Sequence, residues 1–98
     1  MAIKSFKNKA TEDIGNQAFS KKSLKLLLKK LHTIAYRRLI FLDNSASLQD
    51  LKEWKSLYLE KLKRDRSGQF SIRINDQYRV CFNWIDNHAH DVEIVHYH

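Results

Sequence analysis

The second half of the chain carries side chains that together could cleave RNA. They are Glu60, Lys63, Arg66, Arg79, Tyr97 and His98. Cleavage without a metal needs a group that accepts the proton of the 2′-hydroxyl, cations that stabilise the crowded phosphorane, and an acid that protonates the leaving 5′-oxygen. Histidine, glutamate and tyrosine can carry the protons, and lysine and arginine can hold the dianion. The residue types therefore permit this chemistry without establishing it.

Three alternating segments near the C-terminus predict a sheet that would position these side chains, with one apolar face and one largely polar face. The apolar positions are Phe70, Ile72, Ile74, Tyr78, Val80, Phe82, Trp84, Val92 and Ile94. A three-residue hairpin loop at 75–77 keeps apolar residues opposite one another, whereas a two-residue loop would set Asn75 beside Tyr78. The expected pairs are Ile74 with Tyr78, Ile72 with Val80, and Phe70 with Phe82.

A longer loop, residues 85–91, is expected between the second and third strands. It would pair Trp84 with Val92 and, further along, Arg79 with Tyr97. The open polar face would then bring together Arg73, Arg79 and Tyr97, with Lys63 and Arg66 from the preceding segment and His98 at the rim. Tyr97, an aromatic residue at the end of a basic face, is a candidate for stacking on a nucleobase.

The first half predicts helices that cover the apolar face. A short strand at 2–7 and a helix at 9–19 are expected, followed by a long helix from Ser23 and a single turn at 48–54 that starts at a capping box, Ser47 to Asp50. The buried stripe of the long helix would be Leu24, Leu27, Leu28, Leu31, Ile34, Ala35, Leu39 and Leu42. Its other side is a basic ridge made of Lys22, Lys25, Lys29, Lys30, Arg37 and part of His32.

Positive charge is concentrated in the helical half. The formal net charge is +7, and residues 1–38 hold ten Lys and Arg against two acidic residues, while residues 39–98 hold eight against nine. Such a field attracts polyanions, so nucleic acid or an acidic protein is a better partner than a neutral metabolite. The alternative is a solvated surface that only aids solubility.

Length and composition narrow the class of protein. Ninety-eight residues suit one domain, 1–98, without a second lobe or a cofactor chamber. Cys81 is the only cysteine, which excludes an internal disulfide and fits a reducing cytoplasm. No run approaches the ~20 apolar residues of a membrane span. We expect no cofactor and no metal, although His88, His90, His96 and His98 are possible metal ligands. We also expect Cys81 to be an interior residue rather than a nucleophile.

Residues 59–82 and 91–98 resemble the HigB family of toxins in the RelE/ParE superfamily, and the opening Ile3-Lys4-Ser5-Phe6 fits as well. The resemblance spans the chain and is specific in its second half. It implies an α+β, RelE/ParE-like fold, in which two N-terminal helices pack on a small, curved, mainly antiparallel β-sheet.

The resemblance also implies a function. The chain would be the toxin of a type II toxin-antitoxin module, acting as a ribosome-dependent, metal-independent mRNA endonuclease that inhibits translation. Its partners would be the ribosome with its mRNA and a helix-turn-helix, HigA-like antitoxin, which links it to operator DNA. Two alternatives stay open: a ParE-like inhibitor of DNA gyrase, and a catalytically weakened toxin that mainly binds its antitoxin. The same fold can host these activities.

Position by position, the resemblance implies roles for individual residues. The active-site lysine falls on Lys63, the arginine that steadies the phosphate on Arg79, and the terminal tyrosine and histidine on Tyr97 and His98. Glu60 stands where members carry His or Glu, and is the further proton carrier. Arg66 and Arg73 would contact backbone phosphates, and the ridge of Lys22, Lys25, Lys29 and Lys30 would grip ribosomal RNA.

Two positions depart from the family pattern. Arg64 stands where a glycine is usual, which adds charge beside Lys63 and removes a flexible point. His96 stands where an aspartate is common, so any proton-accepting or orienting task of that aspartate would fall to an imidazole. Strand parity places His96 on the same side as Ile94. There, a histidine that only packs at the rim of the sheet is as good an interpretation as a catalytic one.

Overall fold

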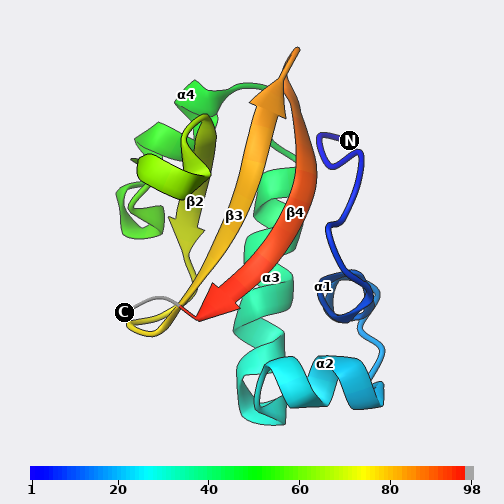
Figure 1. Ribbon diagram of the computed structural model, residues 1–98. Coiled ribbons are helices and arrows are strands. Elements are labelled where there is room, and N and C mark those ends of the chain that lie inside the picture. Colours follow the sequence, from blue (N-terminus) through cyan, green and yellow to red (C-terminus); the bar gives the residue numbers. More distant parts are fainter. Residues whose placement is uncertain (97–98) are drawn as a thin grey trace.

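The computed structural model describes residues 1–96, and it shows an α+β fold in which helices lie against one face of a four-stranded antiparallel sheet (Figure 1). The strands follow chain order across the sheet. They are β1 (Glu60–Lys61), β2 (Gln69–Arg73), β3 (Tyr78–Ile85) and β4 (His88–His96). The helical elements are α1 (Lys9–Gly15), α2 (Lys21–Leu26), η1 (Lys29–Leu31), α3 (His32–Asp43), α4 (Leu48–Glu53), η2 (Lys55–Leu57) and η3 (Arg64–Arg66).

The hairpin of β2 and β3 has the predicted register. Phe70 is opposite Phe82 and Ile72 is opposite Val80, while the backbone N–H of Ile74 donates to the Tyr78 carbonyl at 2.9 Å. The turn is held by the Asn75 side chain, whose Oδ1 accepts the N–H groups of residues 77 and 78, both at 2.8 Å. Asn favours such turns because its side chain binds its own backbone two and three residues on.

The predicted connection between β3 and β4 is wrong. The hairpin closes with only two residues, Asp86 and Asn87, whose φ angles of 51° and 62° are left-handed. Asp and Asn tolerate that region, so a tight turn with both central residues at positive φ is open to this sequence. Trp84 therefore pairs with Ala89 rather than with Val92.

A β-bulge then returns the apolar side chains of β4 to the core side of the sheet. Between the Cys81–Glu93 and Asn83–His90 pairs, one residue of β3 faces two of β4, and Asp91 takes a left-handed φ of 53°. The extra residue shifts the alternation by one, so that Val92 and Ile94 still point into the core. As a consequence Arg79 lies opposite Val95, not opposite Tyr97 as the sequence predicted.

The apolar face of the sheet forms the core with α3, which lies behind the strands in Figure 1. The sequence prediction of this face is confirmed. The buried residues of this core include Ile72, Val80, Phe82, Val92 and Ile94 from the sheet. From the helical half they include Ile14, Leu27, Ala35, Leu39 and Leu42.

The N-terminal segment extends the sheet at β4, although only two bridges form where a strand at 2–7 was expected. Ile3 and Phe6 pair in parallel with Ala89 and Val92. Thr11 continues this edge, because its Oγ1 accepts the backbone N–H of Ile94 at 3.1 Å. The otherwise unpaired edge of β4 is thus covered by the first residues of the chain.

The long helix predicted from Ser23 to Leu42 is broken, and the helix predicted at 9–19 ends at Gly15. At Leu27 the backbone is extended, and its carbonyl accepts a hydrogen bond from His32 Nε2 at 2.8 Å. His32 is therefore buried, not on the exposed ridge. The break also leaves Leu24 and Leu28 in solvent, since the two short helices no longer share one face. The predicted turn at 48–54 is confirmed as α4.

No helix within residues 1–96 has both the length and the apolar character to cross a membrane.

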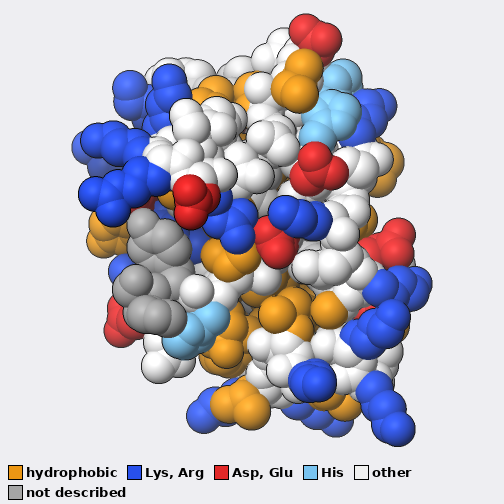
Figure 2. All heavy atoms as spheres, viewed as in Figure 1, with side chains coloured by type: hydrophobic (Ala, Val, Ile, Leu, Met, Phe, Trp, Pro, Cys, Tyr) orange, Lys and Arg blue, Asp and Glu red, His pale blue; other side chains and the backbone are white. Residues whose placement is uncertain are grey.

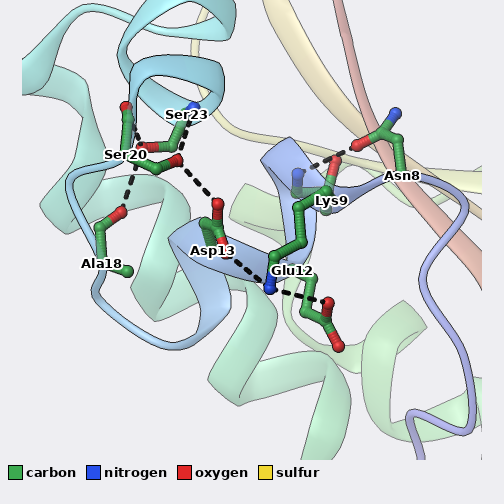
Figure 3. Close-up of polar contacts among 8 residues, drawn as sticks. Asn8, Lys9, Glu12, Asp13, Ala18, Ser20 and Ser23 are labelled. Carbon is green, nitrogen blue, oxygen red and sulfur yellow. Dashed lines mark hydrogen bonds and ion pairs between the residues drawn. The ribbon is translucent and has the colours of Figure 1, made fainter.

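A polar cluster fastens α1 to the start of α2 (Figure 3). Ser20 Oγ donates to the Asp13 carboxylate at 2.6 Å, and Lys9 Nζ lies 3.1 Å from its other oxygen. The hydroxyl of Ser20, helped by the ammonium of Lys9, holds the pKa of Asp13 below its ordinary value, against the opposing effect of desolvation. Ser20 also caps α2 by accepting the N–H of Ser23. Asp13 thus links two helices through one side chain.

The first prediction concerns the pH dependence of this cluster. A lowered pKa means that Asp13 stabilises the fold above the ordinary aspartate pKa of about 3.9, and that this stabilisation is lost as pH falls through the lower, folded value. Asp13→Asn should therefore reduce the free energy of unfolding at pH 7, and the difference from the unsubstituted chain should shrink below about pH 4. Urea denaturation across pH measures it.

Glu12→Gln is the matched control, because the Glu12 side chain is 44% exposed and contacts Lys9 at 3.4 Å. It should change stability little at any pH, since exposed ion pairs contribute little. A deficit of Asp13→Asn that stayed constant down to pH 2 would contradict the assigned role.

Arg64, at the start of η3, has a left-handed φ of 58°. That conformation costs an L residue about 1–2 kcal/mol, and glycine adopts it freely. The position is the one where the family resemblance leads one to expect glycine. The left-handed φ gives the physical reason for that preference. In this chain the backbone at Arg64 is strained instead.

The second prediction is that Arg64→Gly raises the free energy of unfolding by roughly 0.5–1 kcal/mol, because the relieved strain exceeds the entropy of about 0.4–1 kcal/mol that glycine adds to the unfolded chain. Arg64→Ala is the control: it removes the same charge but keeps the strain. Equal stabilisation by both variants in chemical denaturation would assign the effect to charge instead.

Candidate active site

Arg79 lies at the centre of the polar face of the sheet, which was predicted to be open but is covered here, since Ser71 and Cys81 of the same face are also buried. Its side chain is nearly buried, and the whole residue is 8% exposed. The guanidinium donates from Nε to Ser71 Oγ at 2.7 Å and from Nη2 to the carbonyl of Tyr58, and its Nη2 lies 3.8 Å from a Glu60 carboxylate oxygen. A buried guanidinium with several acceptors is held in one orientation. The structure therefore fixes the cation that the sequence had singled out.

A second arginine stands directly across the strand pair. Arg73 on β2 is the register partner of Arg79 on β3. Like charges at such positions repel. Arg73 is stabilised by an ion pair with Asp76 and lies over the Tyr58 ring, 5.4 Å from its centroid. Two guanidinium groups on adjacent strands form a site suited to an anion with several oxygens, such as a phosphate.

Glu60 and Lys63 belong to the segment that leads into β2. Glu60 lies on β1 opposite Ser71, and its side chain is half exposed. Lys63 is exposed and directly precedes η3. Two surface depressions meet at Glu60. One is lined by residues 60–66, and the other, of about 350 Å³, by Tyr58, Glu60, Arg73, Asn75, Asp76 and Arg79. Glu60, Arg73 and Arg79 therefore line one depression, and Lys63 lines the other one that Glu60 shares.

Arg66 has a structural task besides the predicted phosphate contact. Its Nη1 forms an ion pair with Glu93 on β4 at 3.2 Å and donates to Gln69 at 3.1 Å. It thereby ties η3 across the polar face to β4. A role of Arg66 in RNA binding stays a prediction.

Cys81 is confirmed as an interior residue. It is 1% exposed, and burial raises the pKa of its thiol. The thiolate is the reactive form of cysteine, so a raised pKa makes this side chain a poor nucleophile.

The basic ridge on α2 and η1 is separate from this site. Figure 1 places α2 at the lower right, far from the segment that contains β1 and η3 at the upper left. In Figure 2, lysine and arginine side chains lie at the upper left, along the lower edge and at the right of the molecule. Lys22, Lys25, Lys29 and Lys30 are all exposed, and Lys29 Nζ lies 4.9 Å from the Phe19 ring centroid. The structure does not bring them to Arg79.

The end of the chain holds two more predicted catalytic residues. Tyr97 and His98 lie outside the described residues. His96, the last residue described, is exposed and packs edge-on against Tyr78 with ring centroids 5.0 Å apart, in agreement with a rim histidine. Among residues 1–96 there is no group of three His, Cys, Asp or Glu side chains placed to hold a metal ion.

Another hollow, of about 480 Å³, lies on the outer side of α3 and is lined by Tyr36, Arg37, Ile40, Phe41, Asn44, Ser45 and Asp50. It contains none of the residues predicted to carry protons or bind the scissile phosphate.

Two residues that hold the site were missed at the sequence level. Ser71 is 0% exposed on the polar face, and strand parity could have placed it beside Arg79. Tyr58 contributes its backbone carbonyl from a left-handed turn, with φ 48°. No local pattern indicates such a conformation, because tyrosine rarely adopts it.

Comparison with known proteins gives results that agree with this geometry. Residues 4–98 match the model of the family described as HigB-like toxin, a RelE-like toxin of a type II toxin-antitoxin system. The chain is 32% identical to Toxin HigB-1 of Vibrio cholerae serotype O1 over 65 residues, which cover 66% of this chain and 68% of that protein.

Solved structures have a similar fold. The YoeB-YefM complex from Staphylococcus aureus is similar with a TM-score of 0.61 and 26% identity, covering 100% of this chain and 97% of the matched chain. The YoeB dimer from the same organism gives a TM-score of 0.53 at 25% identity and the same coverage. With a family match across nearly the whole length and a curated relative above 30% identity, the chain belongs to the HigB family of RelE-like toxins of type II toxin-antitoxin systems.

Proposed function

We propose that this toxin is a ribosome-dependent, metal-independent endoribonuclease that cuts mRNA and so inhibits translation. The observation that carries the proposal is the fixed guanidinium of Arg79, which faces Arg73 across the strands and has the Glu60 carboxylate beside it. Cations held rigidly at a phosphate contribute most to the cleavage, because charge builds up on the phosphorane oxygens in the transition state.

In this reaction the 2′-hydroxyl of a nucleotide attacks the adjacent phosphorus, and the bond to the 5′-oxygen breaks. Arg79 and Lys63 stabilise the phosphorane, and Arg66 and Arg73 bind neighbouring phosphates. Proton transfer falls to Glu60, Tyr97 and His98, of which the last two come from the family resemblance. The products carry a 2′,3′-cyclic phosphate and a 5′-hydroxyl.

The partners follow from the same proposal. Solved relatives include a heterotetrameric complex of YoeB-YefM toxin-antitoxin, which supports a protein antitoxin for this chain too. We propose that the antitoxin is a helix-turn-helix, HigA-like protein that silences the toxin and links it to operator DNA.

We further propose that the basic ridge of Lys22, Lys25, Lys29 and Lys30 grips ribosomal RNA while the sheet performs the chemistry. None of these lysines lines either of the depressions that meet at Glu60, which supports two distinct contacts, one for docking and one for cleavage. Exposed lysines without acidic neighbours on the same short segment suit the nonspecific binding of a phosphate backbone.

The third prediction tests the cleavage site. Arg79→Ala should reduce mRNA cleavage about 10²–10³-fold, the usual cost of removing one preorganised donor to the transition state. Arg79→Lys should also fail to restore it, because lysine cannot donate to Ser71 and Tyr58 and hold a phosphate in one geometry. Primer extension on an mRNA translated in vitro measures the cuts, and end-group analysis should find the cyclic phosphate.

Lys52→Ala, on the exposed side of α4, is the control and should cut normally. Deletion of His98 should also impair cleavage. Cutting that is undiminished in the Arg79 variants, or that occurs without ribosomes, would contradict the proposal, as would inhibition of gyrase supercoiling without any mRNA cleavage.

The fourth prediction concerns the ridge. Replacement of Lys22, Lys25, Lys29 and Lys30 by glutamine should weaken binding to ribosomes. It should also reduce the slope of log binding constant against log salt concentration by about 0.7–0.9 for each phosphate that the ridge no longer neutralises. Co-sedimentation with ribosomes at several salt concentrations measures both. A Lys52→Gln, Lys55→Gln double variant, which removes exposed lysines near α4, should bind as the unsubstituted toxin does. Equal losses of affinity in both variants would refute a specific ridge.

A further inference from the structure

Tyr58 combines an exposed aromatic ring with an unfavourable backbone conformation. The residue is 59% exposed, and its φ of 48° lies in the left-handed region at the end of η2. A bulky residue in that region is uncommon, and such strain tends to occur at functional sites. Packing of the ring does not account for it, since most of the residue faces solvent.

The left-handed turn brings Tyr58 against both phosphate-binding arginines. Its carbonyl accepts a hydrogen bond from Arg79 Nη2, and its ring lies under the guanidinium of Arg73 at 5.4 Å. One residue therefore holds one guanidinium through its backbone and stacks against the other through its side chain. The ring consequently cannot be far from a phosphate bound at Arg79.

The surroundings of the ring suit a nucleotide. Tyr58 lines the depression of about 350 Å³ that also contains Arg73, Arg79 and Glu60. Arg73 covers part of the ring, and the exposed remainder offers an apolar, flat surface. Aromatic rings beside arginines bind single-stranded RNA by stacking on a base while the cations bind its phosphates.

We infer that Tyr58 is the stacking platform for the base next to the phosphate held by Arg79. The inference rests on the proposed function and adds a binding contact on single-stranded RNA that neither the residue pattern nor the family resemblance supplied. It is separate from the stacking expected of Tyr97, because Tyr58 approaches from the segment before β1.

The fifth prediction uses two substitutions that separate the ring from the backbone. Tyr58→Asn removes the ring but favours the left-handed conformation, so the carbonyl that holds Arg79 stays in place. Tyr58→Phe keeps the ring. Binding is measured by fluorescence anisotropy with a labelled, single-stranded 2′-O-methyl oligoribonucleotide, which has no free 2′-hydroxyl and is not cut.

Tyr58→Asn should bind this oligonucleotide about tenfold more weakly, and Tyr58→Phe should bind like the unsubstituted toxin. Ile85→Asn is the control for the loss of an exposed apolar side chain. Ile85 is 54% exposed and lies six residues further along β3, about 20 Å from Arg79. It should leave binding unchanged.

Cleavage of ribosome-bound mRNA provides a second readout. Stacking stabilises the bound RNA and the transition state alike, so Tyr58→Asn should raise the half-saturating toxin concentration about tenfold with little change in the maximal rate. A loss in the maximal rate alone would mean that Arg79 had moved, and would overturn the stacking role.

The outcomes separate this inference from the proposed function. If the unsubstituted toxin cuts mRNA and Tyr58→Asn binds and cuts equally well, the inference fails and the proposed function stands. If the toxin cuts nothing on ribosomes but binds the oligonucleotide through Tyr58, the proposed function fails and the inference stands. If the unsubstituted toxin does not bind the oligonucleotide, the inference is refuted.

Discussion

The guanidinium group of Arg79 is almost completely buried at the middle of the sheet. This burial constrains the residues around it. Burial of an unpaired charge costs several kcal/mol, so Arg79 requires acceptors in fixed positions. Ser71, the Tyr58 carbonyl and the Glu60 carboxylate meet that need. They come from β2, from the turn after η2 and from β1, and the cation therefore holds three separate segments together. In the proposed function, this fixed guanidinium is the group that binds the scissile phosphate.

The hairpin register places this cation and is itself set by local chemistry. Asn75 closes the turn through two hydrogen bonds to the backbone, and the register that follows sets Arg73 opposite Arg79. A slip by one residue would turn one of the two strands over, so that its arginine faced the core and its buried Ile72 or Val80 faced water. The apolar face thus enforces the charge arrangement of the polar face, and the repulsion between the two arginines is a cost that a bound anion would relieve.

The connection that supplies the other candidate site residues contains two bulky residues in a strained backbone conformation. Tyr58 and Arg64, which flank β1 and Lys63, both have left-handed φ angles, and such residues persist only where the surrounding structure holds them. Arg66 provides part of that support through Glu93. The segment is thereby kept against the sheet by side-chain contacts rather than by regular secondary structure, as is common where a loop carries functional groups.

Alternation, turn chemistry and capping residues were enough to predict the α+β class, the face of the sheet that forms the core, the register of β2 with β3 and the start of α4, because these depend on residues close in sequence. The family pattern also identified Arg79, Lys63 and Glu60 as candidates. The bulge at Asp91 and one partner of Arg79 depended on contacts between distant segments, since the Asp91 N–H donates to Ser5 Oγ and the Tyr58 carbonyl accepts a hydrogen bond from Arg79. The break at Leu27 depended on the burial of His32, whose ring stacks on Phe19 from the preceding segment. Local sequence could not decide them, since the competing backbone conformations differ by only a few kcal/mol and tertiary contacts of similar size select among them.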